Sequence, residues 1–479
     1  MKGGFLMRFS HPTDSVTAEG PRPLDTDKDL IPGVCILADD LTGAADAANY
    51  FRTGLYRVRV SLNPDAPWDP ALGPHVVQVA DTESRAADPE EARRRVARAA
   101  GGLKDLGTRL GTAGAGGVHV YKKVDSTLRG HLGIELEAAL EALGRRFAVV
   151  APSFPANGRQ VVGGRLSVHG TPVHQTAFAQ DPRNPIVSDR VADVIAQGTQ
   201  LPVEELPLSV VRSGPAAAAS WLDALGTGTR AVVVDAESED DLAVIADAFA
   251  GREDVLLCGS AGLAKQLPRH WLAKPGAGTD GSADRNVRDD AAGPGQGHDP
   301  CDRVLVLVGS ANPAAHRQLE VLAQRAGIRV TELDPVQLAD PRTAAEELAR
   351  ATQELVHSIA AHERQHSPGR VMAAAALGTR RPTGAAGHRF EDDLAAAAKA
   401  WFERAAGQAI GFVATGGDTA LALCRAIGVH AIWPEGEVAP GIPWNTIETP
   451  HGRALLVTKA GGFGAEDALW RAVQLLTRS

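Results

Sequence analysis

Aromatic residues and cysteines are scarce in this chain. Aromatic side chains make up 4% of its 479 residues, and alanine and glycine supply much of the apolar content. The four cysteines, Cys35, Cys258, Cys301 and Cys424, are widely spaced and form no C-x-x-C pair. This pattern argues against a zinc site or a disulfide framework and favours a reducing compartment, so we expect a cytoplasmic protein.

Long apolar runs and a basic charge excess are also missing. No run of 18 apolar residues occurs, so we expect no membrane span. Residues 1–30 contain no apolar core of a secretory signal, and we interpret them as a disordered tail. A net charge of -9 makes nucleic acid an unfavourable partner. The sequence leaves open whether the chain forms a homo-oligomer.

Two common nucleotide-binding motifs are absent. No G-x-x-x-x-G-K-[ST] segment is present, which excludes a P-loop kinase. No G-x-G-x-x-G follows the first expected strand, which argues against a nicotinamide-dependent dehydrogenase.

Short apolar runs alternate with helical patterns from Val34 onward, which indicates an α/β fold with mostly parallel sheets. The length predicts two domains, each a mostly parallel sheet flanked by helices, with an active-site cleft between them. A helix is predicted to start after Asp88, which would cap it, with Pro89 in its first turn. The first-half strands are expected at 34–38, 58–60, 76–80, 118–121, 147–150, 231–234 and 255–258.

Composition places the domain boundaries. Lys274 to Pro300 has almost no large apolar residue, so we expect domains at 31–272 and 303–479 joined by a linker at 273–302. The second domain should contain strands at 304–308 and 328–331 and near Val371 and Phe412, and a hairpin pairing 446–449 with 454–459. Residues 377–390 read as a polar surface insertion.

Charged side chains follow the first-half strands, where open α/β sheets bind ligands. Asp39 and Asp40 follow the first strand, although one of them could simply cap a helix. Lys123, Asp125 and Arg129 precede a later helix and could hold a carboxylate or phosphate while Asp125 accepts a hydrogen bond from a hydroxyl. Their alternative is a surface ion-pair network. Arg85 and Arg159 lie in further strand-end loops, and Arg159 is a plausible second anion anchor.

Glycine-rich loops follow three second-half strands, at 309–313, 415–419 and 459–464, and each is expected to open a helix. Such loops expose backbone N–H groups in a geometry that binds phosphate, so three of them favour a polyphosphate nucleotide. Asp418 could hold magnesium, its alternative role being a helix cap, and Lys459 could neutralise phosphate charge.

In order along the chain, these loops resemble the four-carbon acid sugar kinases. The resemblance covers residues 33–272 and 303–477 and rests on ADDLTGAAD from Ala38, DTESR from Asp81, KKVDSTLRG from Lys122, APSFPANGR from Ala151, TGGDTA from Thr415 and KAGGFG from Lys459. It implies an N-terminal sugar-acid-binding domain, a C-terminal nucleotide-binding domain, and transfer of the ATP γ-phosphate to the terminal hydroxyl of a four-carbon sugar acid, with Mg²⁺.

Motif positions carry the family's functional residues over to this chain. The resemblance places these residues around the substrate: Asp39, Asp40, Arg85, Lys123, Asp125, Arg129 and Arg159. It places these around ATP: Ser310, Gly416, Gly417, Asp418, Thr419 and Gly461.

Phosphoryl transfer needs a carboxylate to take the hydroxyl proton, and Asp125 is the first candidate, with Asp40 the second. Arg129, Lys123 or both are expected to pair with the substrate carboxylate.

The identity of the substrate stays open within this resemblance. His131 stands where the family pattern has Asn, and Ala311-Asn312 also depart from it. The run Val173 to Pro185 looks more like D-threonate or D-erythronate kinases than like 3-oxo-tetronate kinases. A non-catalytic sugar-acid sensor is the alternative of a different class, and the glycine-rich loops argue against it.

Overall fold

The computed structural model describes residues 33–73, 75–109, 118–181, 184–272, 298–310, 312–363, 373–379 and 390–477. The expected tail at 1–30, residues 273–297 of the expected linker, and residues 380–389 of the expected surface insertion lie outside this range.

The first half forms an entirely parallel set of strands. In space their order is β2-β3-β1-β4-β11-β5-β10-β9. Every strand predicted in this half is present. Their bounds are β1 Gly33–Ala38, β2 Arg57–Ser61, β3 Val76–Asp81, β4 Val118–Lys123, β5 Phe147–Ala151, β9 Val203–Leu206, β10 Arg230–Val234 and β11 Val255–Gly259.

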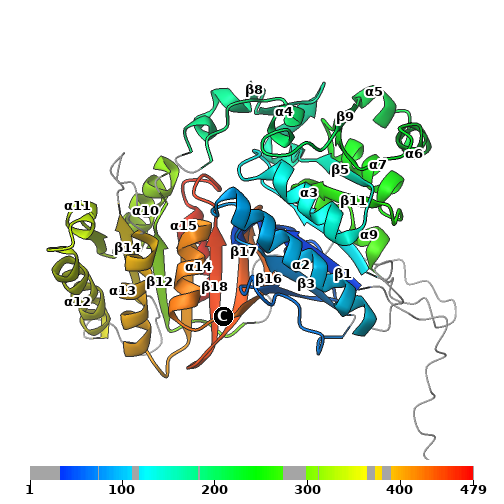
Figure 1. The fold of residues 1–479 in the computed structure, drawn as a ribbon. Helices are drawn as coiled ribbons and strands as arrows, with labels where there is room; N and C mark the ends of the chain where they lie inside the picture. The colour runs from blue at the N-terminus through cyan, green and yellow to red at the C-terminus, as the bar shows by residue number, and fades with distance from the viewer. Residues whose placement is uncertain are drawn as a thin grey trace, which may run out of the picture.

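Helices cover both faces of this sheet (Figure 1). Asp88 caps α2 as predicted, since its Oδ1 accepts a hydrogen bond from the N–H of Glu91 at 2.9 Å. The helices are α1 Leu41–Asn49, α2 Pro89–Arg109, α3 Leu132–Leu143, α4 Val191–Ile195, α5 Leu208–Val211, α6 Pro215–Asp223, α7 Glu239–Phe249, α8 Ala261–Ala264 and α9 Pro268–Trp271. A small antiparallel sheet is inserted after β5: β6 Arg159–Val162, β7 Arg165–Val168 and β8 Thr171–Pro172.

The second half adds a parallel group and an antiparallel hairpin. Its strands are β12 Arg303–Val308, β13 Val330–Leu333, β14 Ala373–Thr379, β15 Ile410–Thr415, β16 Ala431–Ala439, β17 Ile442–Thr449 and β18 Gly452–Lys459. Its helices are α10 Pro313–Ala326, α11 Pro335–Ala339, α12 Ala344–Glu363, α13 Phe390–Arg404, α14 Gly417–Ala426 and α15 Ala468–Thr477. The predicted hairpin is confirmed, because Thr446 pairs with Leu455 and Ile447 with Ala454 in antiparallel register.

The expected surface insertion at 377–390 was partly wrong. Leu377, Gly378 and Thr379 belong to β14, which lies between β12 and β13. Phe390 begins α13 and is 1% exposed. Alanine and glycine in β14 give a weak apolar signal, so the sequence pattern at its end resembles that of a loop.

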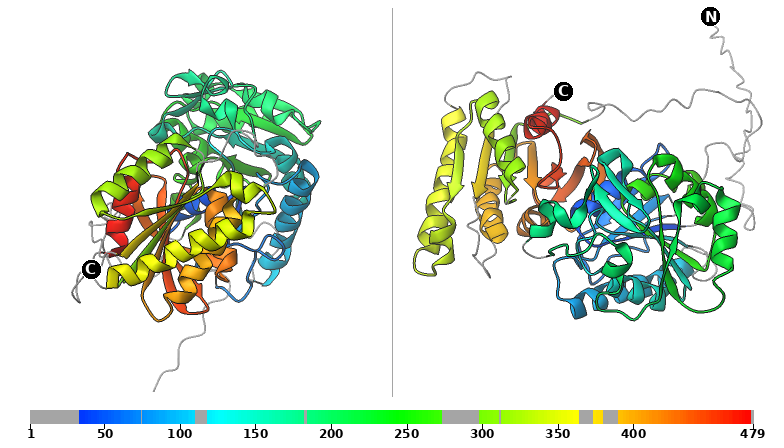
Figure 2. Two further views of the ribbon diagram at one scale, coloured as in Figure 1. Left: turned by 90° about the vertical axis from the view of Figure 1, so that its left-hand side faces the viewer. Right: turned by 90° about the horizontal axis from the view of Figure 1, so that it is seen from above.

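The two halves share one 15-stranded sheet, which the sequence did not predict. The junction is antiparallel: Ala431 and Ile432 of β16 pair with Ser61 and Val60 of β2. One hydrophobic cluster also crosses it, with Phe51 beside α1 and Ile447 of β17 among its members. Figure 2 shows the halves side by side around this junction.

Strand twist explains how the two sets of strand-end loops meet. Antiparallel pairings between β2, β16, β17 and β18 make β15 run opposite to β1 along the sheet. Six pairings separate β1 from β15, and a twist of roughly 20–25° each rotates the strands by roughly 120–150°. The rotation largely cancels the reversal, so the carboxyl ends of both strand groups approach one another.

None of the helices in the described ranges combines the length and the apolar character that crossing a membrane requires.

Candidate active site

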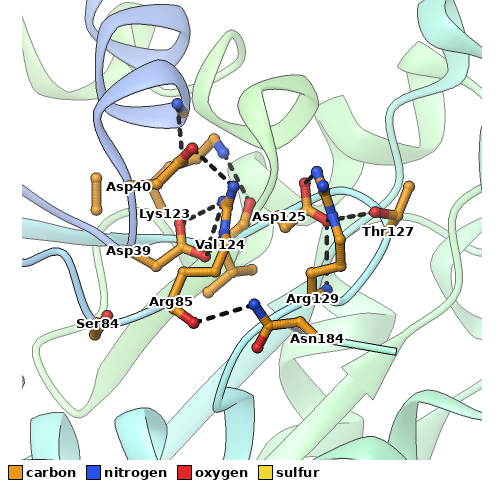
Figure 3. A network of polar contacts seen from close by, with 12 residues as sticks. Asp39, Asp40, Ser84, Arg85, Lys123, Val124, Asp125, Thr127, Arg129 and Asn184 are labelled. Carbon is orange, nitrogen blue, oxygen red and sulfur yellow. Dashed lines mark hydrogen bonds and ion pairs between the residues drawn. The ribbon is translucent and has the colours of Figure 1, made fainter. Parts of the chain in front are cut away.

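Arg85 links the two carboxylates that follow β1 (Figure 3). Its Nε and Nη2 each donate to Asp39 at 2.9 Å, and its Nη1 lies 2.7 Å from Oδ2 of Asp40. Burial alone would lower the pKa of Arg85, but the two carboxylates raise that pKa well above its usual range. Asp39 is 1% exposed, so this fork fixes the loop after β3 against the loop after β1.

Asp40 caps α1 and remains partly accessible. Its Oδ1 accepts a hydrogen bond from the N–H of Gly43 at 2.9 Å, which confirms the capping role considered for one of the two acids. The side chain is 20% exposed. Burial raises the pKa of the Asp40 carboxyl above its ordinary value, although the adjacent Arg85 guanidinium opposes this shift. Asp40 is therefore a better proton acceptor than a surface aspartate.

The two lysines that end β4 have different surroundings. Lys122 is fully buried and its Nζ lies 2.6 Å from Oε2 of Glu135 on α3, so it is a structural ion pair. Lys123 donates from Nζ to the carbonyl of Val124 at 2.8 Å. The same ammonium lies 2.8 Å from the position that a Cβ would take on Gly43. Lys123 thus places a positive charge at the start of α1, beside Asp40.

Asp125 is saturated with hydrogen bonds. Arg129 donates to it from Nε at 2.8 Å and from Nη2 at 3.1 Å, and the Thr127 hydroxyl also donates to it. Burial would raise the pKa of Asp125, but Arg129 and Arg85 hold that pKa well below its usual range. A second carboxylate, Asp181, lies 3.3 Å from Nη1 of Arg129. Arg129 is thus already paired with two carboxylates.

Arg159 has fewer partners than Arg129. Its Nη1 donates to the carbonyl of Asn157, and its buried Nε has no hydrogen-bond partner among the described residues. The guanidinium lies over the ring of Phe463, 5.5 Å from the centroid. Burial lowers the pKa of Arg159, so an incoming anion would be strongly favoured there. This contact joins the first half to the loop after β18.

The three glycine-rich loops of the second half contact one another. A Cβ on Gly461 would lie 2.0 Å from Oγ of Ser310, so only glycine lets the loops after β18 and β12 approach this closely. The Thr419 hydroxyl lies 2.2 Å from the position of a Cβ on Gly309. Gly416, with φ of 102°, is the N-cap of α14 and provides no side-chain cap.

One expectation about these loops was wrong. The loops after β12 and β15 open α10 and α14, but the 459–464 loop runs on to α15, which begins at Ala468. Lys459 holds the conformation of the 459–464 loop. Its Nζ donates to the carbonyls of Ala460, Gly461 and Phe463 at 2.8, 3.0 and 3.1 Å. Burial lowers the pKa of Lys459 to about 7.

The two halves touch at Asp40 and Gly417. A Cβ on Gly417 would lie 3.2 Å from Oδ2 of Asp40 and 3.0 Å from Oγ1 of Thr42. At the other end of α14, Arg425 forms an ion pair with Glu83 from the loop after β3, which is a second contact between the halves. The carboxylates and cations of the first half therefore directly face a glycine-rich helix start of the second.

Comparison with known proteins assigns each half. Residues 34–267 match the family described as a sugar-binding N-terminal domain, and residues 305–469 match a nucleotide-binding C-terminal domain. A D-erythronate kinase of Heliobacterium modesticaldum is 32% identical over 463 residues, covering 92% of this chain and 97% of the relative. The chain belongs to the four-carbon acid sugar kinase family.

Other members of this kinase family are similar to the same extent. A D-threonate kinase of Salmonella typhimurium is 32% identical, covering 91% of this chain and 97% of its own. A 3-oxo-tetronate kinase of Methylobacterium radiotolerans is also 32% identical, covering 92% and 98%. A solved structure of a Salmonella typhimurium LT2 protein superposes with a TM-score of 0.68 at 24% identity, covering 92% of this chain and 98% of that one, and supports the fold.

Sequence reasoning missed three residues of this candidate site. Asp181 pairs with Arg129, Asn184 donates from Nδ2 to the carbonyl of Arg85 at 3.2 Å, and Phe463 supports Arg159. Asp181 and Asn184 lie in an irregular segment that follows no strand of the main sheet, so the strand-end rule did not reach them. Phe463 lies in the KAGGFG motif, whose glycines indicate phosphate binding but give no signal for an aromatic contact.

The donor set of this kinase suits magnesium only with help from a ligand. Among the described residues no group of three or more His, Cys, Asp or Glu side chains could hold a metal ion. Mg²⁺ is commonly held by one or two carboxylates together with phosphate oxygens and water, and Asp418, in the first turn of α14, provides one such carboxylate.

Proposed function

We propose that this kinase transfers the γ-phosphate of ATP to the terminal hydroxyl of a four-carbon sugar acid, D-threonate or D-erythronate. Relatives that act on these two acids, by their names, are as similar as one named for 3-oxo-tetronate, so the oxo acid is the second candidate. A non-catalytic sensor would not need the three phosphate-type loops.

The contact between Asp40 and Gly417 carries the proposal. It sets a carboxylate flanked by Arg85 and Lys123 against the start of α14, where backbone N–H groups favour phosphate. Phosphoryl transfer requires mainly alignment and cancellation of charge, and both are available at this contact.

Asp40 is the proton acceptor that we propose, in preference to Asp125. The substrate hydroxyl oxygen forms a bond to the γ-phosphorus, the bond to the bridging oxygen breaks with its electron pair leaving on ADP, and the hydroxyl proton passes to Asp40. The raised pKa of Asp40 suits this role, whereas the lowered pKa of Asp125 makes that carboxylate a weak base.

Arg159 is the principal anchor that we propose for the substrate carboxylate, with Lys123 and Arg129 contributing positive charge. The Nε of Arg159, which has no partner among the residues that the structure describes, supports this order, because Arg129 is already engaged by Asp125 and Asp181.

ATP is proposed to lie along the loops that contain Ser310, Gly416 to Thr419 and Gly461. Asp418 would help to hold Mg²⁺, which would neutralise charge on the phosphates. Retention of nucleotide in equilibrium dialysis with and without magnesium, in the wild type and in Asp418→Asn, tests this assignment without using turnover.

A coupled ADP-release assay over D-threonate, D-erythronate, their 3-oxo forms and the matching uncharged polyols tests the activity. We expect turnover with at least one four-carbon acid, and a product that mass spectrometry shows to be a monophosphate. Turnover with none of these acids would reject the proposal, and turnover with the oxo acids alone would select the second candidate.

A further inference from the structure

The starts of helices α1 and α14 meet at the junction of the two halves. Gly417, the first residue of α14, lies against Asp40 and Thr42, the N-cap and second residue of α1. Each helix N-terminus presents backbone N–H groups and the positive end of its dipole. The positive ends of the two dipoles therefore lie close together.

Thr42 adds an independent observation at this point. Thr42 as a whole is 7% exposed. Its Oγ1 is buried without a hydrogen-bond partner in the part of the chain that the structure describes. The hydroxyl lies 3.0 Å from the Cβ position of Gly417, so it faces the start of α14. A buried hydroxyl normally has a partner, and one that lacks it next to two helix starts indicates a ligand.

The charges around Thr42 define the class of ligand. Arg85 contacts Asp40, and the Lys123 ammonium lies beside Gly43 in the first turn of α1. Cations and helix starts together favour an anion with several oxygens, which in this enzyme is a phosphate group. Because Asp40 is adjacent, that phosphate must be the one that receives the substrate hydroxyl.

We propose that Thr42 donates a hydrogen bond from Oγ1 to the γ-phosphate during transfer, with the phosphoryl group held beside the adjoining N-termini of α1 and α14. The inference rests on the proposed kinase function and deepens it. Thr42 belongs to the half matched as sugar-binding, so the first half then contributes directly to the nucleotide site.

Replacement of Thr42 by valine removes the hydroxyl and keeps the shape of the side chain. We expect Thr42→Val to lower kcat roughly 10- to 100-fold, as for loss of a hydrogen bond to a charged group. Thr42→Ser, which keeps the hydroxyl, should retain kcat within about threefold. Thr458→Val is the matched control and should leave kcat unchanged. The Oγ1 of Thr458 is likewise buried with no partner in the described part of the chain, but this residue lies in strand β18.

Calorimetry gives a second readout that needs no sugar acid. Thr42→Val should weaken the β,γ-imido analogue of ATP by about tenfold and leave the affinity for ADP within about twofold, because only the triphosphate reaches Thr42. Thr42→Ala serves as a second hydroxyl-free variant if the valine variant does not fold.

Three results would overturn the role of Thr42: wild-type kcat in either hydroxyl-free variant, equal losses for the analogue and ADP, or a serine variant as poor as valine. A wild type that phosphorylates no four-carbon acid would instead reject the proposed function. The contrast between the analogue and ADP would still judge the phosphate contact in that case.

Discussion

Asp125 accepts two hydrogen bonds from the guanidinium of Arg129, one from Nε at 2.8 Å and one from Nη2 at 3.1 Å. The sequence alone favoured Asp125 as the base and Arg129, Lys123 or both as the carboxylate anchor. Once the two side chains pair with each other, neither is well suited to those roles. Their ion pair instead fits a structural role, in which it fixes the conformation of the loop after β4.

Asp125→Asn should therefore destabilise the fold. Removing one partner of a largely buried ion pair costs about 3 kcal/mol in the free energy of unfolding at pH 7. Because the folded-state pKa of Asp125 lies well below 3.8, this stabilisation is present above that pH and is lost as pH falls further. Urea unfolding in steps from pH 7 to pH 2 should show the difference in stability between the variant and the wild type narrowing below about pH 4. A constant difference would contradict the pairing.

Asp40→Asn should abolish most turnover while substrate binding survives. Loss of a general base typically costs roughly 10²- to 10⁴-fold in kcat. The wild-type rate should fall as pH decreases through the raised pKa of Asp40, since protonation removes the acceptor. Rates of both proteins across pH 4 to 9 provide the check, and an acid limb that persists in the variant would assign the base elsewhere.

Arg159→Ala should lose kcat/KM in a way that depends on substrate charge. Loss of one charge-assisted hydrogen bond predicts roughly 10- to 100-fold on a four-carbon acid and much less on the uncharged polyol. Arg190→Ala is the control arginine, because Arg190 pairs with Glu205 in the same half, away from the site. Equal losses on acid and polyol would give Arg159 a structural role.

Lys459 should couple nucleotide binding to protonation. With a pKa of about 7, its amine is largely neutral at pH 8, and bound phosphates should raise that pKa. Calorimetry of ADP binding at pH 8 in two buffers of different ionisation enthalpy should therefore reveal proton uptake. The Lys459→Met variant subtracts any proton change of the nucleotide itself. Uptake that is unchanged in this variant would place the phosphates away from Lys459.

Gly417→Ala should reduce activity without unfolding the protein. The new Cβ would lie 3.0 Å from Oγ1 of Thr42 and 3.2 Å from Oδ2 of Asp40, which crowds both groups. We expect a loss in kcat of about tenfold, as for a small misplacement of reacting groups. Gly251→Ala is the control, because a Cβ there would meet no atom of the described residues within 4 Å. Wild-type kcat in the Gly417→Ala variant would show that the contact of Gly417 with Asp40 and Thr42 does not affect catalysis.

The sequence predicted the parallel strands well because each is a short apolar run followed by turn or charged residues. Strand β9, Val203–Leu206, was missed since its two glutamates hide the apolar signal. The pairing of β2 with β16 was also missed, because backbone hydrogen bonds between segments so far apart leave no trace in composition.

The candidate site was predictable as a set of residues and less so as a set of roles. The loops after β1, β3 and β4 do bring Asp39, Arg85 and Asp125 into one network (Figure 3). Which carboxylate pairs with which cation depends on reach and burial. Asp181 lies far from Arg129 in the sequence, but its ion pair with Arg129 leaves that arginine less available to a substrate.

The hydrogen-bonded ladder that runs through β2 and β16 constrains how this enzyme can move. Two domains joined only by a flexible linker could rotate freely about that linker. Two domains that share one β-sheet can move relative to each other mainly by a change in the twist of the sheet. Small changes in twist, distributed over the strands between β1 and β15, alter the distance between Asp40 and Gly417 without breaking a pairing. We therefore expect any change in the spacing of the two sets of strand-end loops to be an elastic torsion of the shared sheet.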